Sequence, residues 1–342
     1  MKVLSSLLGD TGPDLERPSR RVLLQRGGTL AAALALARWP QPAFASDPWP
    51  RKPVRIVVQF GPGSASDQHA RLVSEDLQAA FNQPFIVDNR PGASGILAAE
   101  YVAKATPDGY TLLLTTNTAS SINPFIFKKL PYDPIKDFTP VARLSFMPFI
   151  VLVSAELPVK NVRELVTYAK RTNISYGYAN ATGQVAASTL ANLGHFEAGA
   201  VPYKSTPAAM TDLIGGHIAF MIGDLGSASS LIASNRVRPL AVITSKRSTL
   251  APALPTVSES LSIDFDLPSW LGIMGPAGMP TPIVQALNTR ITSLLGRKGT
   301  AEKLAAAGAE PAPATPTELA AYMKQQLEVW RIKVRDAGIQ PQ

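Results

Sequence analysis

Residues 55–67 read Arg55-Ile56-Val57-Val58-Gln59-Phe60-Gly61-Pro62-Gly63-Ser64-Ala65-Ser66-Asp67. The first six residues are mostly apolar and β-branched, which predicts a short buried strand. The Gly-Pro-Gly sequence that follows predicts a turn, and Ser66 and Asp67 are residue types that cap helices. Apolar residues then recur at helical spacing from Gln68 to Phe81. The segment is therefore predicted to form a strand, a turn and a helix in immediate succession.

The same order of elements recurs along the rest of the chain. Short apolar runs predict strands at 85–88, 110–115, 149–153, 175–179, 200–203, 218–222, 241–244 and 270–275. Helical spacing predicts helices at 96–104, 162–170, 184–193, 208–214, 282–295, 302–307 and 318–337. This alternation is typical of parallel sheets covered by helices on both faces. We expect an α/β protein with two lobes and a ligand cleft between them.

Residues 1–45 have the organisation of a signal peptide. A polar start contains Ser19-Arg20-Arg21-Val22-Leu23-Leu24, the apolar segment Gly27–Ala37 follows, and Ala43-Phe44-Ala45 fits a cleavage site. The paired arginines indicate a twin-arginine export signal. The alternative is an amphipathic N-terminal helix that contains two arginines by chance. We expect cleavage near Ala45/Ser46 and a periplasmic protein.

Composition excludes several classes of protein. The chain has 342 residues, enough for one large or two medium domains, and contains no cysteine, which excludes disulfides, thiolate catalysis and iron–sulfur clusters. The 11-residue segment Gly27–Ala37 is too short to cross a bilayer. The net charge of +8 is spread without basic runs, so no nucleic-acid partner is expected.

Catalytic and cofactor-binding motifs are also missing from the sequence. The three histidines, His69, His195 and His217, lack ligand partners at metal-site spacing. The turn Gly61-Pro62-Gly63 begins like a dinucleotide-binding fingerprint, but Ser66 stands where the third glycine would be. Neither a G-x-S-x-G elbow nor a phosphate-binding P-loop occurs. We therefore expect no enzymatic activity, no cofactor and no metal.

Five turns rich in Gly, Ser, Thr and Asn join predicted strands to predicted helices. They are Gly61–Asp67, Thr115–Ser121, Asn180–Gln184, Lys204–Ala208 and Gly223–Ser227. Helix N-termini present free backbone N–H groups and the positive end of the helix dipole, so such turns can bind anions. The alternative at each turn is that the polar side chains only cap their helices.

Short segments in a constant order along residues 49–311 match the pattern of one protein family. They include Trp49-Pro50-Arg51-Lys52-Pro53, Asp88-Asn89-Arg90-Pro91-Gly92-Ala93, Ala105-Thr106-Pro107-Asp108-Gly109-Tyr110, Leu130-Pro131-Tyr132-Asp133-Pro134, Val201-Pro202-Tyr203-Lys204, Leu240-Ala241-Val242-Ile243-Thr244 and Ala307-Gly308-Ala309-Glu310-Pro311. On these segments the chain resembles the periplasmic solute-binding receptors of tripartite tricarboxylate transporters, the Bug family.

The resemblance implies a type II-like periplasmic binding protein with two lobes, a cleft between them and hinge strands that cross from lobe to lobe. Lobe 1 would comprise 47–148 plus 270–342, and lobe 2 would comprise 149–269. Such a receptor, expected as a monomer, would close on a small carboxylate and deliver it to a membrane permease. The alternative is a ligand-presenting receptor of a signalling system, which the ectodomain of a membrane sensor would bind.

The polar turns and the resemblance together select the candidate ligand-binding residues. These are Gly63, Ser64, Ala65, Ser66, Asp67, Thr116, Asn117, Asn180, Ala181, Thr182, Tyr203 and Asp224. Ser64, Ser66 and Thr182 are expected to donate to a ligand carboxylate. Asn117 and Asp224 are expected to contact the rest of the ligand, whereas Asp67 is expected chiefly to cap its helix. Ser64 and Ala65 replace glycines of the family pattern, so the resemblance names no single ligand.

Overall fold

The first strand, β1 (Val54–Val58), is followed by the predicted turn and helix, α2 (Ala65–Phe81). The helix begins before the predicted Gln68, and its N-cap is Ser64, so the expectation that Ser66 and Asp67 cap it is wrong: both lie in the first turn. The computed structural model describes residues 49–341, so the predicted signal peptide at 1–45 lies outside the described residues. Every element below belongs to one compact unit that begins at Trp49. Between residues 49 and 341, none of the helices has both the length and the apolar composition that a membrane span requires.

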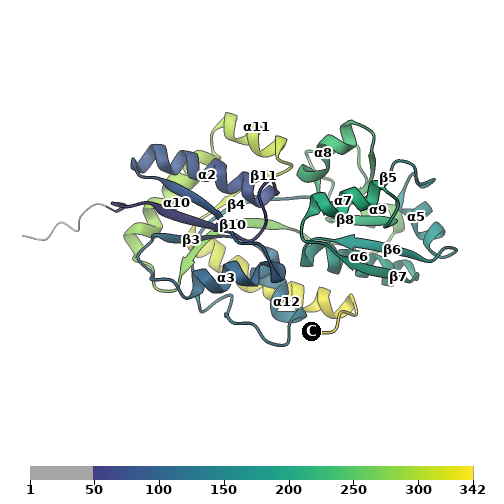
Figure 1. The fold of residues 1–342 in the computed structure, drawn as a ribbon, viewed down its shortest axis with the longest axis horizontal. Coiled ribbons are helices and arrows are strands. Elements are labelled where there is room, and N and C mark those ends of the chain that lie inside the picture. Colours follow the sequence, from purple (N-terminus) through teal and green to yellow (C-terminus); the bar gives the residue numbers. More distant parts are fainter. Residues whose placement is uncertain (1–48, 342) are drawn as a thin grey trace, which may run out of the picture. The chain divides into compact units, whose positions relative to one another are not determined.

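A six-stranded sheet organises lobe 1 (Figure 1). Its strand order is β11-β4-β10-β3-β1-β2. The further strands are β2 (Phe85–Asn89), β3 (Thr111–Thr116), β4 (Phe138–Phe146), β10 (Trp270–Pro276) and β11 (Glu310–Ala314). Strand β1 pairs in parallel with β2 and β3, whereas β10 is antiparallel to both β3 and β4. Strands β1 to β4 come from the first part of the described chain, whereas β10 and β11 come from its last part. The sheet is therefore built from both parts.

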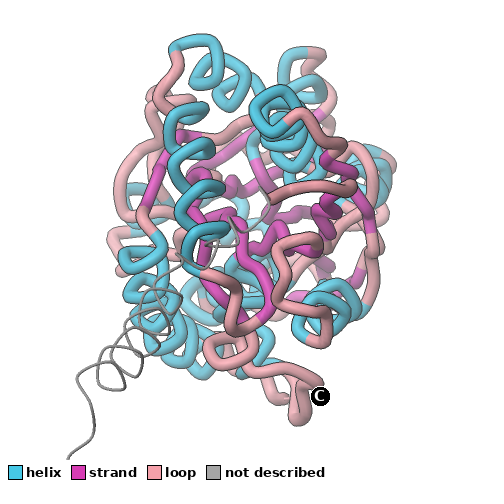
Figure 2. Tube along the Cα trace, turned by 90° about the vertical axis from the view of Figure 1, so that its left-hand side faces the viewer, coloured by secondary structure: helices cyan, strands magenta, loops and turns pink. Residues whose placement is uncertain are grey.

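Successive residues of β1 point to opposite faces of the sheet and enter different cores. Ile56 and Val58 belong to the core that also holds buried residues of α2 and α10 (Thr281–Leu295). Val57 belongs to the core of α3 (Ile96–Ala103) and α12 (Pro316–Asp336). Residues Ile56 to Val58 are all apolar because both faces of the strand are covered. Figure 2 shows strands in the interior of the molecule with helices around them.

A five-stranded sheet organises lobe 2, in the order β7-β6-β8-β5-β9. Its strands are β5 (Phe149–Ser154), β6 (Ile174–Tyr178), β7 (Ala198–Pro202), β8 (Phe220–Asp224) and β9 (Val237–Val242). Helices α5 (Val162–Ala169) and α6 (Ala181–Gly194) contribute to the core on one face, and α7 (Thr206–Ile214) and α8 (Leu225–Ala233) to the core on the other. The remaining helical segments are η1 (Ala93–Gly95), η2 (Thr118–Ile122), α4 (Asn123–Ile126), α9 (Val257–Leu261) and α11 (Lys298–Ala306).

The chain passes from one sheet to the other twice. It leaves the first sheet through Met147 and Pro148, between β4 and β5, and returns through the segment that ends at Ser269, before β10. The two passages are joined by a hydrogen bond from Met147 N to Ser269 O, 2.9 Å long. Met147 and Phe149 also belong to a core cluster that includes residues of both sheets. We propose that these passages are the limits of lobes 47–148 plus 270–342 and 149–269.

The predicted alternation of strands and helices is confirmed, but the sheets are mixed and not purely parallel. Strands β4, β5 and β10 flank the crossings, and each one pairs antiparallel to its neighbours because the chain reverses there. The sequence analysis assigned no strand to β4 or β11. Pro140 lies beside a register shift in β4, and β11 holds Pro311 and Pro313 at the edge of its sheet, where proline is tolerated.

A charged cluster joins α2 to α10, far apart in the sequence. The Asp76 side chain, only 8% exposed, accepts hydrogen bonds from Nε and Nη2 of Arg290 at 2.6 and 2.7 Å. Nη1 of Arg297 donates to the same carboxylate at 2.7 Å. This carboxylate therefore holds the C-terminal part of the chain against the first helix.

Replacing Asp76 by alanine should lower the free energy of unfolding by about 2 kcal/mol, because hydrogen bonds to charged groups contribute roughly 1.5–3 kcal/mol. Urea unfolding followed by circular dichroism measures the change. The control is Lys104→Ala, which removes an exposed pair with Glu100 and should cost about 0.5 kcal/mol or less. Equal losses in the two variants would contradict the role given to Asp76.

Candidate functional site

A cavity of about 220 Å³ lies between the loops of the two lobes. Lobe 1 contributes the β1–α2 loop with Phe60, Gly61, Pro62, Ser64, Ala65 and Ser66, and the end of β3 with Thr116, Asn117 and Thr118. Lobe 2 contributes Ala179, Asn180, Thr182, Lys204, Ser205, Thr206, Pro207 and Asp224. Met147 and Ser269 come from the crossings, and Phe149 is the first residue of β5.

Four helices begin at this cavity, and a side chain caps each of them. Ser64 accepts from Asp67 N of α2 at 3.2 Å, and Asn180 from Gly183 N of α6 at 2.9 Å. Ser205 caps α7 and Asp224 caps α8 in the same way. Each cap occupies one N–H group, while the other N–H groups of a first turn have no acceptor within the helix. Four positive helix ends that meet at one cavity favour a bound anion.

A chain of hydrogen bonds joins the two lobes beside the cavity. Asn117 is in lobe 1, and its Nδ2 donates to Oγ1 of Thr182, in α6 of lobe 2, at 2.9 Å. The Oδ1 atom of Asn117 accepts from Oγ of Ser269 at 2.9 Å. All three side chains are buried. Asn117 is therefore held by one partner from the crossing and one from the opposite lobe.

A buried polar cluster supports the β3 end of the cavity. Gln59, next after β1, donates from Nε2 to Oγ1 of Thr115 at 3.3 Å and accepts from Oγ1 of Thr116 at 3.2 Å. The hydroxyls of Thr115 and Ser120 lie 2.7 Å apart. These contacts fix the end of β3 and the π-helical turn Thr118–Ile122 that follows it. Thr116 is therefore held at the cavity by Gln59, which follows the neighbouring strand β1.

Only two of the cavity-lining residues within the described chain have ionisable side chains, Lys204 and Asp224. Lys204 is exposed, whereas Asp224 is 4% exposed at the end of β8. Burial raises the pKa of Asp224, and hydrogen bonds from Ser227 act in the opposite direction. The N–H of Ser227 lies 2.7 Å from Oδ1 of Asp224. The cavity thus combines positive helix ends with a single buried carboxyl group.

The structure places eight of the twelve candidate residues at the cavity and four outside it. Ser64, Ala65, Ser66, Thr116, Asn117, Asn180, Thr182 and Asp224 line it, whereas Gly63, Asp67, Ala181 and Tyr203 do not. Asp67, in the second set, is bonded to neighbouring residues through Oδ2. Oδ2 of Asp67 accepts from Gly63 N at 3.0 Å and from Nε of Arg71 at 2.9 Å.

Tyr203 and Ala181 are not among the residues that line the cavity. The Tyr203 hydroxyl donates to Oδ2 of Asp212 at 2.7 Å. Burial and this acidic partner raise the pKa of Tyr203 to about 12. Ala181 is the first residue of α6 and is buried. Both residues therefore support neighbouring segments and do not reach the cavity.

Sequence reasoning did not select several of the lining residues. Ser205 and Thr206 lie in a turn that the sequence identified, and Ser205 occupies a helix-cap position, so a capping pattern could have selected them. Ser269 follows Asn117 by 152 residues and reaches it only through the second crossing. No local pattern signals such a contact. Within residues 49–341 no group of three or more acidic or histidine side chains is arranged to hold a metal ion.

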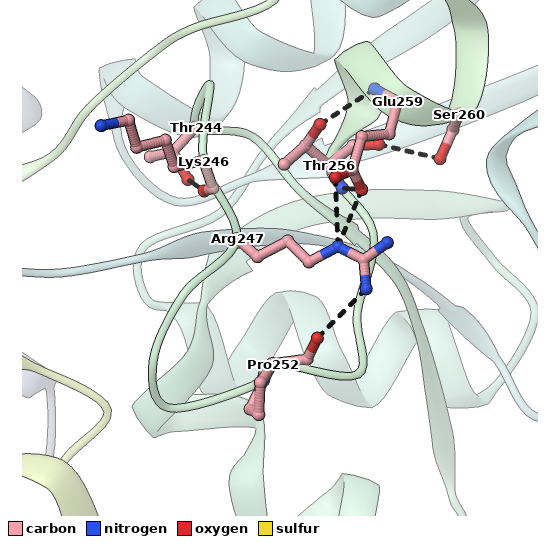
Figure 3. A network of polar contacts seen from close by, with 7 residues as sticks. All are labelled: Thr244, Lys246, Arg247, Pro252, Thr256, Glu259 and Ser260. Carbon is pink, nitrogen blue, oxygen red and sulfur yellow. Dashed lines mark hydrogen bonds and ion pairs between the residues drawn. The ribbon is translucent and has the colours of Figure 1, made fainter.

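Loop 243–256 makes a second contact between the lobes. Arg247 fixes this loop by donating from Nε to both carboxylate oxygens of Glu259, at 2.9 and 3.2 Å, and from Nη1 to the carbonyl of Pro252 (Figure 3). Glu259 in turn completes the capping box of α9. The loop is thereby held against the helix that follows it.

The same loop presents two hydroxyls to lobe 1. Oγ of Ser248 and Oγ1 of Thr249 donate to Oε1 of Glu310 at 2.9 and 2.8 Å. Nearby, Gly226 of α8 and Gly308 of lobe 1 approach so closely that a Cβ atom on Gly226 would overlap with the carbonyl oxygen of Ala307. The backbones of the two lobes are therefore in direct contact at this point.

The family model for the tripartite tricarboxylate transporter family receptor matches residues 69–339 of this chain. Among curated proteins, a UPF0065 protein of Bordetella bronchiseptica is 36% identical over 323 residues, which cover 92% of this chain and 94% of that protein. The match therefore extends over nearly the whole of both proteins.

Solved structures show the same fold. The Rpa4515 protein of R. palustris, solved with adipate, is 34% identical with a TM-score of 0.84, and the alignment covers 86% of this chain and 100% of that one. The periplasmic binding protein BugD is 30% identical with a TM-score of 0.80, over 86% of this chain and 100% of that one. The predicted two-lobed fold of periplasmic binding proteins is thereby confirmed.

Asp224 and Asp67 should change stability with pH in opposite directions. Since the pKa of Asp224 is raised in the folded protein, its ionisation costs folding free energy above the unfolded pKa of about 3.9. Asp224→Asn should therefore gain stability relative to the unsubstituted protein as the pH rises from about 4 to about 7. Melting temperatures of the ligand-free proteins across this range measure the difference.

The matched control is Asp67→Asn. Burial raises the pKa of Asp67, but hydrogen bonds from Arg71, Gly63 and Asn89 outweigh burial, and the pKa is lowered. Ionised Asp67 therefore stabilises the fold, and its loss should be most costly near neutral pH and disappear as the pH falls through the folded pKa. A change of the same sign in both variants would refute the assignment of the two environments.

Proposed function

This chain belongs to the tripartite tricarboxylate transporter family of receptors, and on that premise we propose that its cavity binds a small carboxylate. The receptor closes its lobes on the ligand and presents it to the membrane permease of such a transporter. It works in the periplasm as a monomer without catalysis, after export by the twin-arginine signal and cleavage near Ala45/Ser46.

The observation that carries the proposal is the meeting of four helix N-termini at one cavity. N–H groups at the starts of α2, α6, α7 and α8 supply donors and positive potential without an arginine in the wall. Lys204 adds a cation at the rim. The adipate in the structure of the related Rpa4515 protein supports a carboxylate as the ligand class.

The ligand carboxylate would lie between the starts of α2 and α6, one from each lobe. Ser64 and Ser66 would contact it from lobe 1, and Thr182 from lobe 2. Asn117, already bonded to Thr182, would hold the two sides together around the ligand. Gly63 and Asp67 would act indirectly, by fixing the β1–α2 loop.

Lobe closure follows from the same geometry. The carboxylate-binding groups come from both lobes, so full contact requires the lobes to approach each other. The contacts of Asn117 with Thr182, of Glu310 with Ser248, and of Gly226 with Gly308 would form on closure and be lost on opening. Strands β4, β5 and β10 at the crossings would act as hinges.

The test is thermal-shift screening of residues 46–342 against mono-, di-, tri- and aromatic carboxylates. A ligand that binds only the folded protein raises its melting temperature. At least one carboxylate should raise it by several degrees, and the same compound as a neutral ester should not. The proposal fails if no carboxylate changes the melting temperature.

Gly226→Ala tests closure separately from the chemistry of the cavity. The added methyl group overlaps with the backbone of Ala307, so the lobes cannot approach fully and affinity should fall at least tenfold. Small-angle scattering should show compaction on ligand addition in the unsubstituted protein but not in the variant. Gly299→Ala is the control, since a Cβ there has no atom within 4 Å. Unchanged affinity in Gly226→Ala would exclude this contact from closure.

A further inference from the structure

We infer that Asp224 makes the cavity selective for carboxylates that also carry a hydrogen-bond donor, either a hydroxyl or an ammonium group. The inference rests on the proposed function and specifies the substrate class of that same site. It follows from the position of Asp224, from the contacts of its carboxyl group and from the character of the remaining cavity wall.

The position of Asp224 is fixed by the fold. It is the last residue of β8, a strand with neighbours on both sides, and it pairs in register with Phe149 of β5. It is also the N-cap of α8, with Oδ1 2.7 Å from the N–H of Ser227. These constraints hold Asp224 at the cavity, and the residue is 4% exposed.

Capping uses only part of the acceptor capacity of this group. A carboxylate offers roughly four acceptor positions. The N–H of Ser227 takes one of them, and the hydroxyl of Ser227 and the N–H of Asp224 itself also hydrogen-bond to the group. Within residues 49–341 no basic side chain forms an ion pair with Asp224. The cavity face of the carboxyl group thus remains an acceptor that a ligand can use.

The rest of the wall offers hydrogen-bond donors but no second carboxyl group among the described residues. The helix starts contribute N–H groups, and Ser64, Ser66 and Thr182 contribute hydroxyls. A simple dicarboxylate would satisfy these donors, but a second carboxylate placed at Asp224 would meet a like charge. A hydroxyl or ammonium group there would instead donate to Asp224, and an analogue without it would leave a buried acceptor unpaired.

The test compares matched acids by isothermal titration calorimetry on residues 46–342. One series is succinate, malate and aspartate, and the other is adipate, 2-hydroxyadipate and 2-aminoadipate. In at least one series the hydroxy or amino acid should bind at least tenfold more tightly than the plain acid. Comparing the affinities of the hydroxy acid and the amino acid shows whether the site prefers a hydroxyl or an ammonium group.

The decisive variant is Asp224→Asn. Asparagine caps helices as well as aspartate does, and with its Oδ1 on Ser227 N it turns an NH₂ group toward the cavity. The preference for the donor-bearing acid should fall to about one or reverse. Asp224→Ser, which also retains a cap, serves as the second variant. The control is Asp133→Asn, because Asp133 does not line the cavity and bonds to the N–H of Ile135, and it should keep the preference.

Three results would overturn the inference. The first is equal or tighter binding of the plain acid by the unsubstituted protein in both series, which would show that Asp224 does not select for a donor. The second is a preference that persists in both Asp224 variants. The third, failure of every carboxylate to bind the unsubstituted protein, would refute the proposed function and the inference with it.

Discussion

The N–H groups in the first turn of a helix cannot bond within that helix, and the arrangement of this protein follows from where those groups are placed. Parallel pairing within each sheet brings the starts of α2, α6, α7 and α8 to the carboxyl ends of the strands, which face the cavity. The caps at Ser64, Asn180, Ser205 and Asp224 satisfy one N–H group each. The N–H groups that remain, with the helix dipoles, are the basis of the proposed anion site, whose described lining residues include no arginine.

The sequence predicted the features whose causes are local. The strand, turn and helix at residues 54–81 form as predicted, and eight of the twelve candidate residues lie at the cavity, because each polar turn directly precedes the helix that it caps. Ser269 could not be predicted, since it reaches Asn117 only through the crossing between lobes. Strand β11 was missed because its prolines argue against a strand, and only its edge position tolerates them.

The two aspartates near the helix starts show why residue type alone did not determine the site. Asp67 lies in the first turn of α2 and is bonded to Arg71 and to the backbone of Gly63, so it is a structural residue of the loop. Asp224 caps α8 without a basic partner among the described residues, and its carboxyl group lies at the cavity. The same side chain therefore stabilises the loop in one place and, in the selectivity we propose, contacts the ligand in the other.

The central claim is that the negative charge of a carboxylate is what the cavity binds. The most direct measurement is calorimetric titration of the protein with its best carboxylate ligand and with the amide of the same molecule, which has nearly the same shape but no charge. We expect the carboxylate to bind at least a hundredfold more tightly than the amide. Equal affinity for the two compounds would show that shape and not charge is recognised, and would contradict the account.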